Sequence, residues 1–297
     1  MWIQWILALV LSAGAVAAEP VYRERVADEG LIVPRASGDS ALSGTYRYWK
    51  NPAKLDARLI GDPENNWKLN WVFLDGPFNT DMHAGHLALD RGTKLFRELN
   101  TSGTFKNCLT GSGLGIRKDF DRLRGLRTVF PRYRTDLNRV AGLEEVIEHC
   151  ARLERQELQM GSHDNSAVSM FIASYSNGMP IAIDVSGGEM KKSYERGKQL
   201  FFTKMGRLNL ACASCHVNKV GAFMRATAIT SPYADADHYP VYRDRTGITS
   251  LQLRFAQCSL VLGINPLKMG SRSYTDLEVF FTALTNGHPV SVPSERY

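Results

Sequence analysis

The sequence predicts a mainly helical protein in which one domain occurs twice in tandem. Short motifs recur in the same order at a nearly constant spacing. The segment KKSYERGKQLFFTK also carries Tyr194, Gly197, Leu200 and Phe201 at helical spacing. We expect the chain to divide into a signal peptide (1–18), an N-terminal extension (19–79), a first copy (80–180) and a second copy (181–297).

The amino terminus has the pattern of an exported protein. It opens MWIQWILALVLSAGAVAAEP, an apolar run of signal-peptide length whose A-x-A pattern predicts cleavage after Ala18. No Lys or Arg precedes the apolar run, so an uncleaved amphipathic anchor is the alternative. No later apolar run has the length of a membrane span, and we therefore expect a mature protein without one, in an oxidising compartment.

Composition allows one or two globular domains, because 44% of the 297 residues are hydrophobic. The formal net charge of +6 is spread along the chain and is densest over 117–134, where Asp119 and Asp121 dilute it. This distribution favours a solvated face over a nucleic-acid patch, and it suits an anionic substrate or an acidic partner. We expect no nucleic-acid partner.

The motif with the clearest chemistry is CASCH at 212–216. C-x-x-C-H is the attachment signature of c-type haem, in which Cys212 and Cys215 would bond the porphyrin and His216 would bind the iron. A redox-active cysteine pair and half of a zinc site are the alternatives. Zinc would need a second ligand pair at suitable spacing, and a thioredoxin-like site would need a preceding strand pattern, so we predict haem.

Five matches define the internal repeat. RGTKLF (91–96) recurs as RGKQLF (196–201), and FPRYR (130–134) recurs as YPVYR (239–243). SNGMP (176–180) recurs as TNGHP (285–289). In addition Cys108 matches Cys212, and Cys150 matches Cys258, with all offsets between 104 and 109 residues. We interpret this as a duplication.

The first copy lacks the groups that would hold a haem. Gly111 and Ser112 stand where the second copy has Cys215 and His216, so neither the second thioether nor the proximal imidazole can form. In an oxidising compartment we predict a disulfide between Cys108 and Cys150, with two separate buried thiols as the alternative.

The repeat also assigns Cys258 a place opposite Cys212 across the predicted haem. Cys258 is then a candidate distal iron ligand, with Met269 and the weaker Met224 as rivals. Arg254 precedes Cys258 by four residues, so on a helix its charge would favour the thiolate and could bind an oxyanion. The first copy has Val146 instead; an ordinary surface role for Arg254 is the alternative.

The motifs CASCH, YPVYR and SLQLRFAQC, taken together, resemble the SoxA family of bacterial sulfur oxidation. The resemblance implies an all-α fold of two class I cytochrome c-like domains, here with one covalently bound haem c in the second domain and none in the first. It implies thioether bonds at Cys212 and Cys215, iron ligation by His216 and Cys258, and catalytic roles for Cys258 and Arg254. It also fits the Cys108–Cys150 disulfide.

The resemblance further implies an L-cysteine S-thiosulfotransferase in the periplasm. Such an enzyme joins thiosulfate to a cysteine of the carrier SoxYZ, while a SoxX-type cytochrome partner receives the electrons. A thiosulfate dehydrogenase and a simple His/Met electron-transfer cytochrome are the alternatives. Arg225, Arg243 and Lys219 could steer the anion without an assigned role, and we expect Asp235 and Asp237 to be solvated loop residues.

Overall fold

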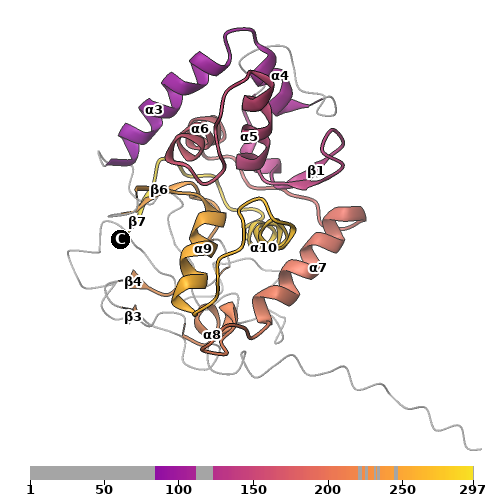
Figure 1. Ribbon diagram of the computed structural model, residues 1–297, viewed down its shortest axis with the longest axis vertical. Coiled ribbons are helices and arrows are strands. Elements are labelled where there is room, and N and C mark those ends of the chain that lie inside the picture. Colours follow the sequence, from indigo (N-terminus) through magenta and orange to yellow (C-terminus); the bar gives the residue numbers. More distant parts are fainter. Residues whose placement is uncertain are drawn as a thin grey trace, which may run out of the picture.

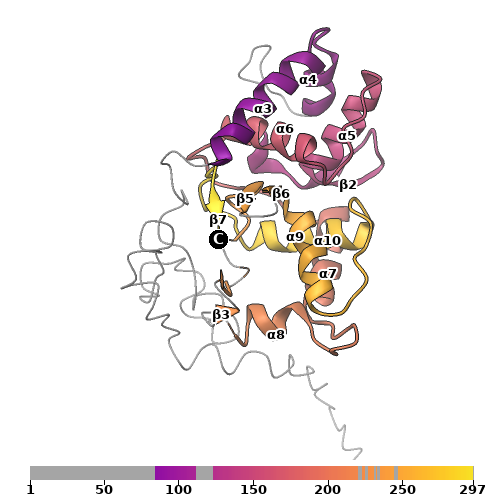
Figure 2. The same cartoon turned by 60° about the vertical axis from the view of Figure 1, so that its left-hand side comes forward.

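The computed structural model describes residues 84–111, 123–219, 223–224, 227–230, 232, 235–243 and 247–296. The predicted signal peptide and N-terminal extension lie outside these residues, as do Ser112 and Arg225. Two helical halves follow one another, which we call the N-terminal unit (84–176) and the C-terminal unit (188–285), and they stack one above the other (Figures 1 and 2).

In its described residues, the N-terminal unit consists of four α-helices, a 3-10 helix and a short hairpin. Its elements are α3 (Ala84–Leu99), α4 (Thr104–Thr110), the 3-10 helix η4 (Arg127–Val129), β1 (Arg132–Arg134), β2 (Arg139–Ala141), α5 (Leu143–Leu153) and α6 (His163–Ser174). Strands β1 and β2 pair antiparallel. Helix α6 begins where the Ser162 side chain accepts a hydrogen bond from the backbone N–H of Asn165, a typical N-cap.

The C-terminal unit repeats this order. Its elements are α7 (Gly188–Phe202), α8 (Cys212–His216), β3 (Phe223–Met224), β4 (Thr227–Ala228), β5 (Val241–Arg243), β6 (Gly247–Thr249), α9 (Leu251–Val261) and α10 (Arg272–Ala283), followed by β7 (Glu295–Arg296). Strand β5 pairs antiparallel with β6 and parallel with β7. The helix predicted before CASCH is confirmed as α7.

In both units the first and last helices cross at a glycine. A Cβ added to Gly92 would lie 2.0 Å from the carbonyl oxygen of Ala167, and one added to Gly197 would lie 2.0 Å from that of Asp276. Such contact requires a residue without a side chain, because any larger residue would push the helix backbones apart. The two RG motifs of the sequence repeat therefore mark the same helix crossing.

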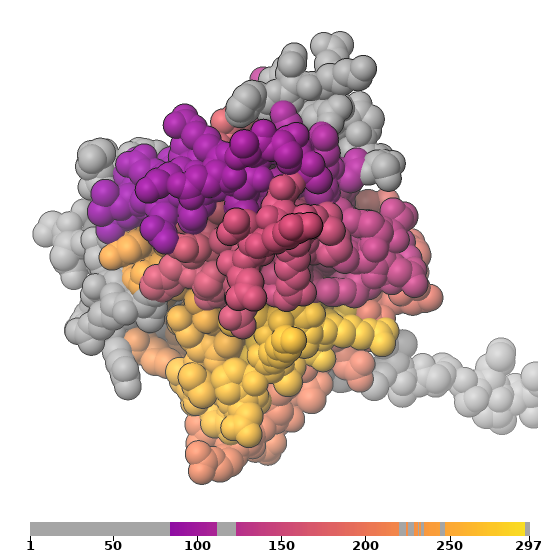
Figure 3. All heavy atoms as spheres, turned by 45° about the horizontal axis from the view of Figure 1, so that its top comes forward, coloured from indigo at the N-terminus to yellow at the C-terminus, as the bar shows by residue number. Residues whose placement is uncertain are grey.

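Each unit has its own hydrophobic core, and a third cluster joins them. The N-terminal core includes Phe96, Phe105 and Phe130, and the C-terminal core includes Phe201 and Phe280. The third cluster draws on both halves of the chain and holds Ala88, Ala167, Met170, Ala173, Ile181, Ile248, Val290 and Val292. In the space-filling view the two units pack directly against each other (Figure 3).

The segments that follow the two units make reciprocal contacts with each other. The Asn177 side-chain amide donates to the carbonyl of Val292 and its oxygen accepts from the Val292 N–H. Asn286, 109 positions after Asn177, makes the same pair of bonds with Ile183, 109 positions before Val292. Exchange of equivalent contacts is the property of a two-fold interface, here formed within one chain.

The prediction of an all-α fold agrees with the helices of the structure, but it omits the short strands that connect them. Strands of two or three residues occur in both units, and each one precedes or follows a helix rather than forming a sheet layer. The strands β1–β2 and β5–β6 directly precede α5 and α9, so they fix where those helices begin. Among the described residues no helix has the length and apolar character to cross a membrane.

Candidate haem site

The C-terminal unit encloses a largely apolar cavity of about 530 Å³ between α8, α9 and α10. Most of its lining is aliphatic or aromatic, as expected of a site for a flat hydrophobic group. The polar residues that line it are Cys212, Cys215, His216, Thr230, Asp235, Tyr239, Arg243, Arg254, Cys258, Ser259 and Tyr274.

The C-x-x-C-H motif forms the short helix α8 at one wall of the cavity. Its first turn is fixed by the backbone N–H of Ala211, which donates to the Ser214 hydroxyl at 3.0 Å. His216 Nδ1 lies 2.7 Å from the carbonyl oxygen of Thr230, so this nitrogen carries the proton and donates it. Nε2 is thereby left free to bind a metal, and the ring orientation is fixed by a second hydrogen bond, as in most metal-ligating histidines.

Cys258 projects from α9 toward the same cavity and is within hydrogen-bonding reach of His216. An iron ion held by His216 and Cys258 would take the place of this hydrogen bond. Two further thiols lie on the cavity wall, at the spacing that covalent haem requires. The donor set therefore fits c-type haem. No cluster of three or more His, Cys, Asp or Glu suited to a bare metal ion occurs among the described residues.

The three free cysteines differ in their electrostatic environment. For Cys258, burial opposes ionisation, but the hydrogen bond with His216 and the positive charges of Arg254 and Arg243 outweigh it and lower the thiol pKa. Burial raises the pKa of Cys212 to about 12 and also raises that of Cys215. Cys258 is thus the thiol most readily converted to thiolate, the form that binds iron and attacks electrophilic sulfur.

The structure brings the predicted Arg254 and Cys258 together on one face of α9. The N-cap Ser250 accepts from the backbone N–H of Leu253, which fixes the start of this helix. Arg243 also lines the cavity although it is only 8% exposed, whereas Lys219 is not among the lining residues. The positive charges of Arg254 and Arg243 both act on the Cys258 thiol, while the Arg254 guanidinium donates a hydrogen bond to Gln257.

The rival iron ligand Met269 packs elsewhere. A Cβ on Gly161 would lie 2.3 Å from the Met269 sulfur, so this thioether fills the space beside a glycine of the N-terminal unit. Gly161 has a φ of 85°, in the left-handed region that favours glycine. Met269 does not line the cavity, while Met224 does so as a half-exposed residue at its edge.

The expectation that Asp235 and Asp237 are solvated is wrong. Both are almost fully buried, at 4% and 2% exposure. The Thr230 hydroxyl donates to Asp235 at 3.2 Å, and Asp237 pairs with His238 Nδ1 at 2.8 Å. The acidic run of this segment resembled a surface loop in sequence because its burial depends on contacts with residues distant in the chain, such as the bond from the Ala236 N–H to the hydroxyl of Thr285, which follows α10.

Two residues at the site had no recognisable sequence signal. Thr230 acts through its backbone carbonyl, which any residue type could supply at that position. Asp235 lies beside it and lines the cavity, but its charge in sequence indicated only a polar loop. Proximity to the motif is the only clue that could have selected them.

The N-terminal unit holds the predicted disulfide at the corresponding place. Cys108 of α4 and Cys150 of α5 are bonded, with their Cα atoms 5.7 Å apart. Around them Phe105, Leu109 and Leu123 are fully buried. Apolar side chains and a covalent bond thus occupy the space between these two helices.

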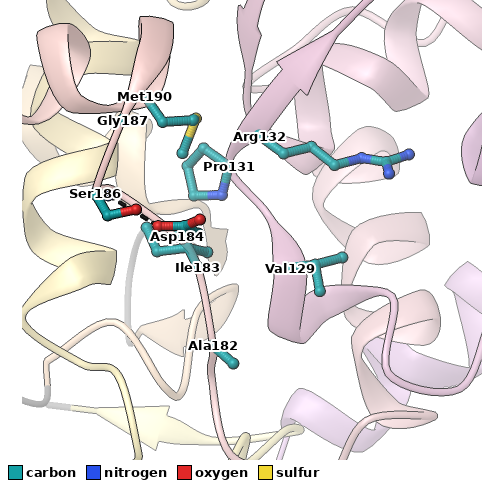
Figure 4. A pocket seen from close by; sticks show the side chains of 9 residues that line it. All are labelled: Val129, Pro131, Arg132, Ala182, Ile183, Asp184, Ser186, Gly187 and Met190. Carbon is teal, nitrogen blue, oxygen red and sulfur yellow. Dashed lines mark hydrogen bonds between the residues drawn. The ribbon is translucent and has the colours of Figure 1, made fainter. Parts of the chain in front are cut away.

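A second cavity, of about 380 Å³, lies where the N-terminal unit meets the segment leading into α7 (Figure 4). Asp184 and Ser186 hydrogen-bond to each other there through the Ser186 N–H, at 2.8 Å. Arg132 lines this cavity but its guanidinium points away from Asp184, toward the carbonyl of Thr110 (Figure 4). No set of convergent reactive groups is present among its lining residues.

Comparison with known proteins places the chain in a family. Residues 93–181 match the family model described as the SoxA/TsdA cytochrome c domain. The L-cysteine S-thiosulfotransferase subunit SoxA of Chlorobaculum tepidum is 31% identical over 242 residues, which cover 80% of this chain and 77% of that protein. The chain belongs to the SoxA family.

Other SoxA relatives extend the match. SoxA of Pseudaminobacter salicylatoxidans is 27% identical over 300 residues, covering 98% of this chain and 94% of that protein. The crystal structure of SoxXA from P. pantotrophus has a TM-score of 0.59 at 24% identity, covering 72% of this chain and 79% of that one, and supports the fold. A cytochrome c domain implies haem c; the matched residues lie in the N-terminal unit and the segment that follows it, whereas the donor set lies in the C-terminal unit.

Proposed function

We propose that this chain joins thiosulfate to a cysteine of a SoxYZ-type carrier protein, forming an S-thiosulfonate. The proposal is supported above all by Cys258, a thiol with a lowered pKa that lies within hydrogen-bonding reach of His216 in a largely apolar cavity also lined by Arg243 and Arg254. The names of the relatives support the same reaction class, because they are described as L-cysteine S-thiosulfotransferase subunits.

The reaction is an oxidation that forms one sulfur–sulfur bond. Thiosulfate and a carrier thiol give the carrier-bound S-thiosulfonate, one proton and two electrons, and no atom is lost. Bound c-type haem supplies the exit for the electrons. Cys258 presents sulfur to the reacting partner, while Arg254 and Arg243 hold the sulfonate oxygens and keep the thiolate ionised. The apolar walls exclude water from the exchange.

We further propose two tandem class I cytochrome c-like domains with a single haem, held by Cys212, Cys215 and His216 in the second. The equivalent helix order and the reciprocal contacts of the two units support the duplication. Cys258 is the distal ligand in this scheme. The Cys108–Cys150 disulfide and the surrounding apolar side chains support a first domain without haem.

The proposed partners are a SoxX-type cytochrome and the SoxYZ carrier, in the periplasm after removal of residues 1–18. The similarity to a chain of a SoxXA crystal structure supports the first partner. The mild positive charge supports an anionic substrate.

The decisive experiment is the low-temperature electron paramagnetic resonance spectrum of the ferric holoprotein, compared with Cys258→Met and with Leu260→Ala. Leu260 is 65% exposed on the same helix and serves as a matched control. A thiolate/imidazole signal that is present in the native protein and in Leu260→Ala, and absent in Cys258→Met, supports the proposal. A His/Met signal in the native protein refutes it.

The product of thiosulfate oxidation separates the two enzymatic alternatives. With carrier present, mass spectrometry should detect the S-thiosulfonate on the carrier cysteine, and the product should be lost with Cys258→Ala. Formation of tetrathionate at an equal rate without carrier would instead establish a thiosulfate dehydrogenase. The position of Met269 against Gly161 disfavours this methionine as the ligand of a simple His/Met cytochrome, the third alternative, which leaves Met224 at the edge of the cavity as its candidate.

A further inference from the structure

Helix α9, which carries Arg254 and Cys258, is attached to α10 near each of its ends. Near its start, Gln252 Nε2 donates to Glu278 Oε2 at 2.7 Å. Near its end, the Ser259 hydroxyl lies 3.1 Å from that of Tyr274. The side chains of Gln252 and Glu278 are almost fully buried, so the first of these bonds is shielded from water.

Gln252 uses both ends of its amide. Its oxygen accepts from the backbone N–H of Gly270 at 2.9 Å, in the turn just before α10. A single side chain therefore joins the first turn of α9 to α10 and to the turn that precedes it. Loss of either bond would leave a buried polar group without a partner.

The N-terminal unit extends this attachment. Thr275, on α10, donates to Glu145 Oε2 of α5 at 3.2 Å, which is a direct hydrogen bond between the units. The carboxylate of Glu278 lies so close to Gly142 that a Cβ there would be 2.6 Å from Oε2. Thr275 and Glu278, the two α10 residues that contact Gln252 of α9, thus also contact the N-terminal unit.

Equivalent positions in the two units carry different versions of the same bond. Glu144 is the second residue of α5 as Gln252 is of α9, and Ser169 is the seventh residue of α6 as Glu278 is of α10. The Ser169 hydroxyl donates to Glu144 Oε1 at 2.8 Å. The second-unit pair differs in one respect, because its helix carries the reactive cysteine.

We propose that Gln252 is a positioning residue, which sets the location of Arg254 and Cys258 by holding α9 to Glu278 and Gly270. The N-terminal unit contributes through the Glu145–Thr275 bond, which fixes α10. This role rests on the proposed function, since it presupposes that Cys258 is the distal ligand. It gives the N-terminal unit a part in catalysis without a cofactor of its own.

The test compares Gln252→Met, Gln252→Asn, Glu278→Gln and the matched control Ser169→Ala in the holoprotein. Methionine retains the size of Gln252 without its hydrogen bonds, asparagine is too short to reach both partners, and Glu278→Gln retains an acceptor. Three quantities are measured for each variant: the thiolate resonance signal of the ferric haem, the rate of thiosulfate-dependent haem reduction, and the melting temperature.

Gln252→Met and Gln252→Asn are expected to shift or split the thiolate signal and to slow haem reduction tenfold to a hundredfold, roughly the cost of misplacing a reacting group by about 1 Å. Glu278→Gln is expected to retain the native signal and rate. Ser169→Ala is expected to lower the melting temperature with signal and rate unchanged, because it removes the equivalent bond in the N-terminal unit, between helices that do not line the cavity.

Two outcomes would overturn these proposals separately. If both Gln252 variants melt at a lower temperature but retain the native signal and rate, Gln252 is structural only and the positioning role is wrong. If the native protein shows no thiolate signal, the proposed function itself fails. Should Gln252→Met not fold, Gln252→Asn decides between these outcomes, since it retains an amide in the same place.

Discussion

Equivalent pairs of helices in the two units differ in what lies between them. In the C-terminal unit, α8 and α9 border a cavity with three free thiols, whereas in the N-terminal unit α4 and α5 are joined by a disulfide and packed apolar side chains. Cys258 and Cys150 stand at matching positions, one facing His216 and the other bonded to Cys108. The comparison teaches that a cofactor cavity in this fold can be replaced by a covalent bond and a hydrophobic core.

The largest effect is expected from removing the covalent attachment in the C-terminal unit. Cys212→Ala combined with Cys215→Ala removes both thioether positions, so the protein should carry no haem that survives denaturation. Haem staining after denaturing electrophoresis measures this. Cys108→Ala combined with Cys150→Ala is the matched control and should stain like the native protein. Staining that depends on Cys108 would show that the N-terminal unit also holds haem.

A second comparison concerns the buried carboxyl group of Glu278, which stands where the N-terminal unit has the hydroxyl group of Ser169. Burial, and next the charge of Glu144, raise the pKa of Glu278 from 4.5 to about 8. The folded protein therefore retains this proton up to a higher pH than the unfolded chain does, and the free energy of unfolding should fall as the pH rises from about 4.5 to about 8, by up to a few kcal/mol. Glu144 and Glu145 of α5 and Arg127 of η4 are the charged groups that act on it.

Glu278→Gln tests this pH dependence. Glutamine remains neutral, so denaturant unfolding at pH 5, 6, 7 and 8 should show a clearly smaller decrease in the free energy of unfolding than in the native protein. Part of the decrease in the free energy of unfolding with pH should remain in this variant, because burial also raises the pKa of Glu145. The control Glu189→Gln replaces an exposed carboxylate at the start of α7 and should leave the native slope. Equal slopes in the native protein and Glu278→Gln would contradict the assignment.

The Cys108–Cys150 disulfide is the next feature that distinguishes the two units. It closes a loop between residues 42 positions apart, and its loss in Cys108→Ala/Cys150→Ala should lower the free energy of unfolding by about 2–4 kcal/mol. Denaturant unfolding of the oxidised protein measures this, and the haem spectrum should remain native. A changed haem spectrum would mean that the N-terminal unit controls the cavity more directly than the contacts through α10 imply.

The helix crossings offer a matched pair of smaller changes. Gly92→Ala and Gly197→Ala each insert a methyl group against a backbone carbonyl, so each should lower the free energy of unfolding by about 1–3 kcal/mol. Only Gly197→Ala should also alter the haem spectrum, because α7 carries Leu200, which lines the cavity. An identical change of the haem spectrum in both variants would show that the helix crossing of the N-terminal unit also affects the haem site.

The sequence was sufficient for features that depend on local spacing. The C-x-x-C-H motif and the four-residue interval from Arg254 to Cys258 predict side chains on one helix face, and the duplication located the Cys108–Cys150 pair. Features that depend on packing between the units could not be predicted in this way. Gln252 and Met269 acquire their environments from α10 and from the N-terminal unit, and Asp235 is buried in a segment that contacts Thr285, beyond the end of α10. A polar or flexible residue type does not indicate which of these it will contact.

The smallest effect is expected from a change at Met269, which the sequence offers as a rival to Cys258 for binding the iron. Met269→Leu exchanges a thioether for a hydrocarbon of similar size against Gly161, and volume-conserving exchanges of this kind usually cost less than about 1.5 kcal/mol. The haem spectrum should be unchanged, because Met269 does not line the cavity. Its counterpart Met160 packs near Gly270 in the same way, so Met160→Leu is the matched control. If Met269→Leu alone changes the ferric resonance signal, the distal ligand is this methionine, and the difference between the units would lie in a thioether rather than in the free thiol of Cys258.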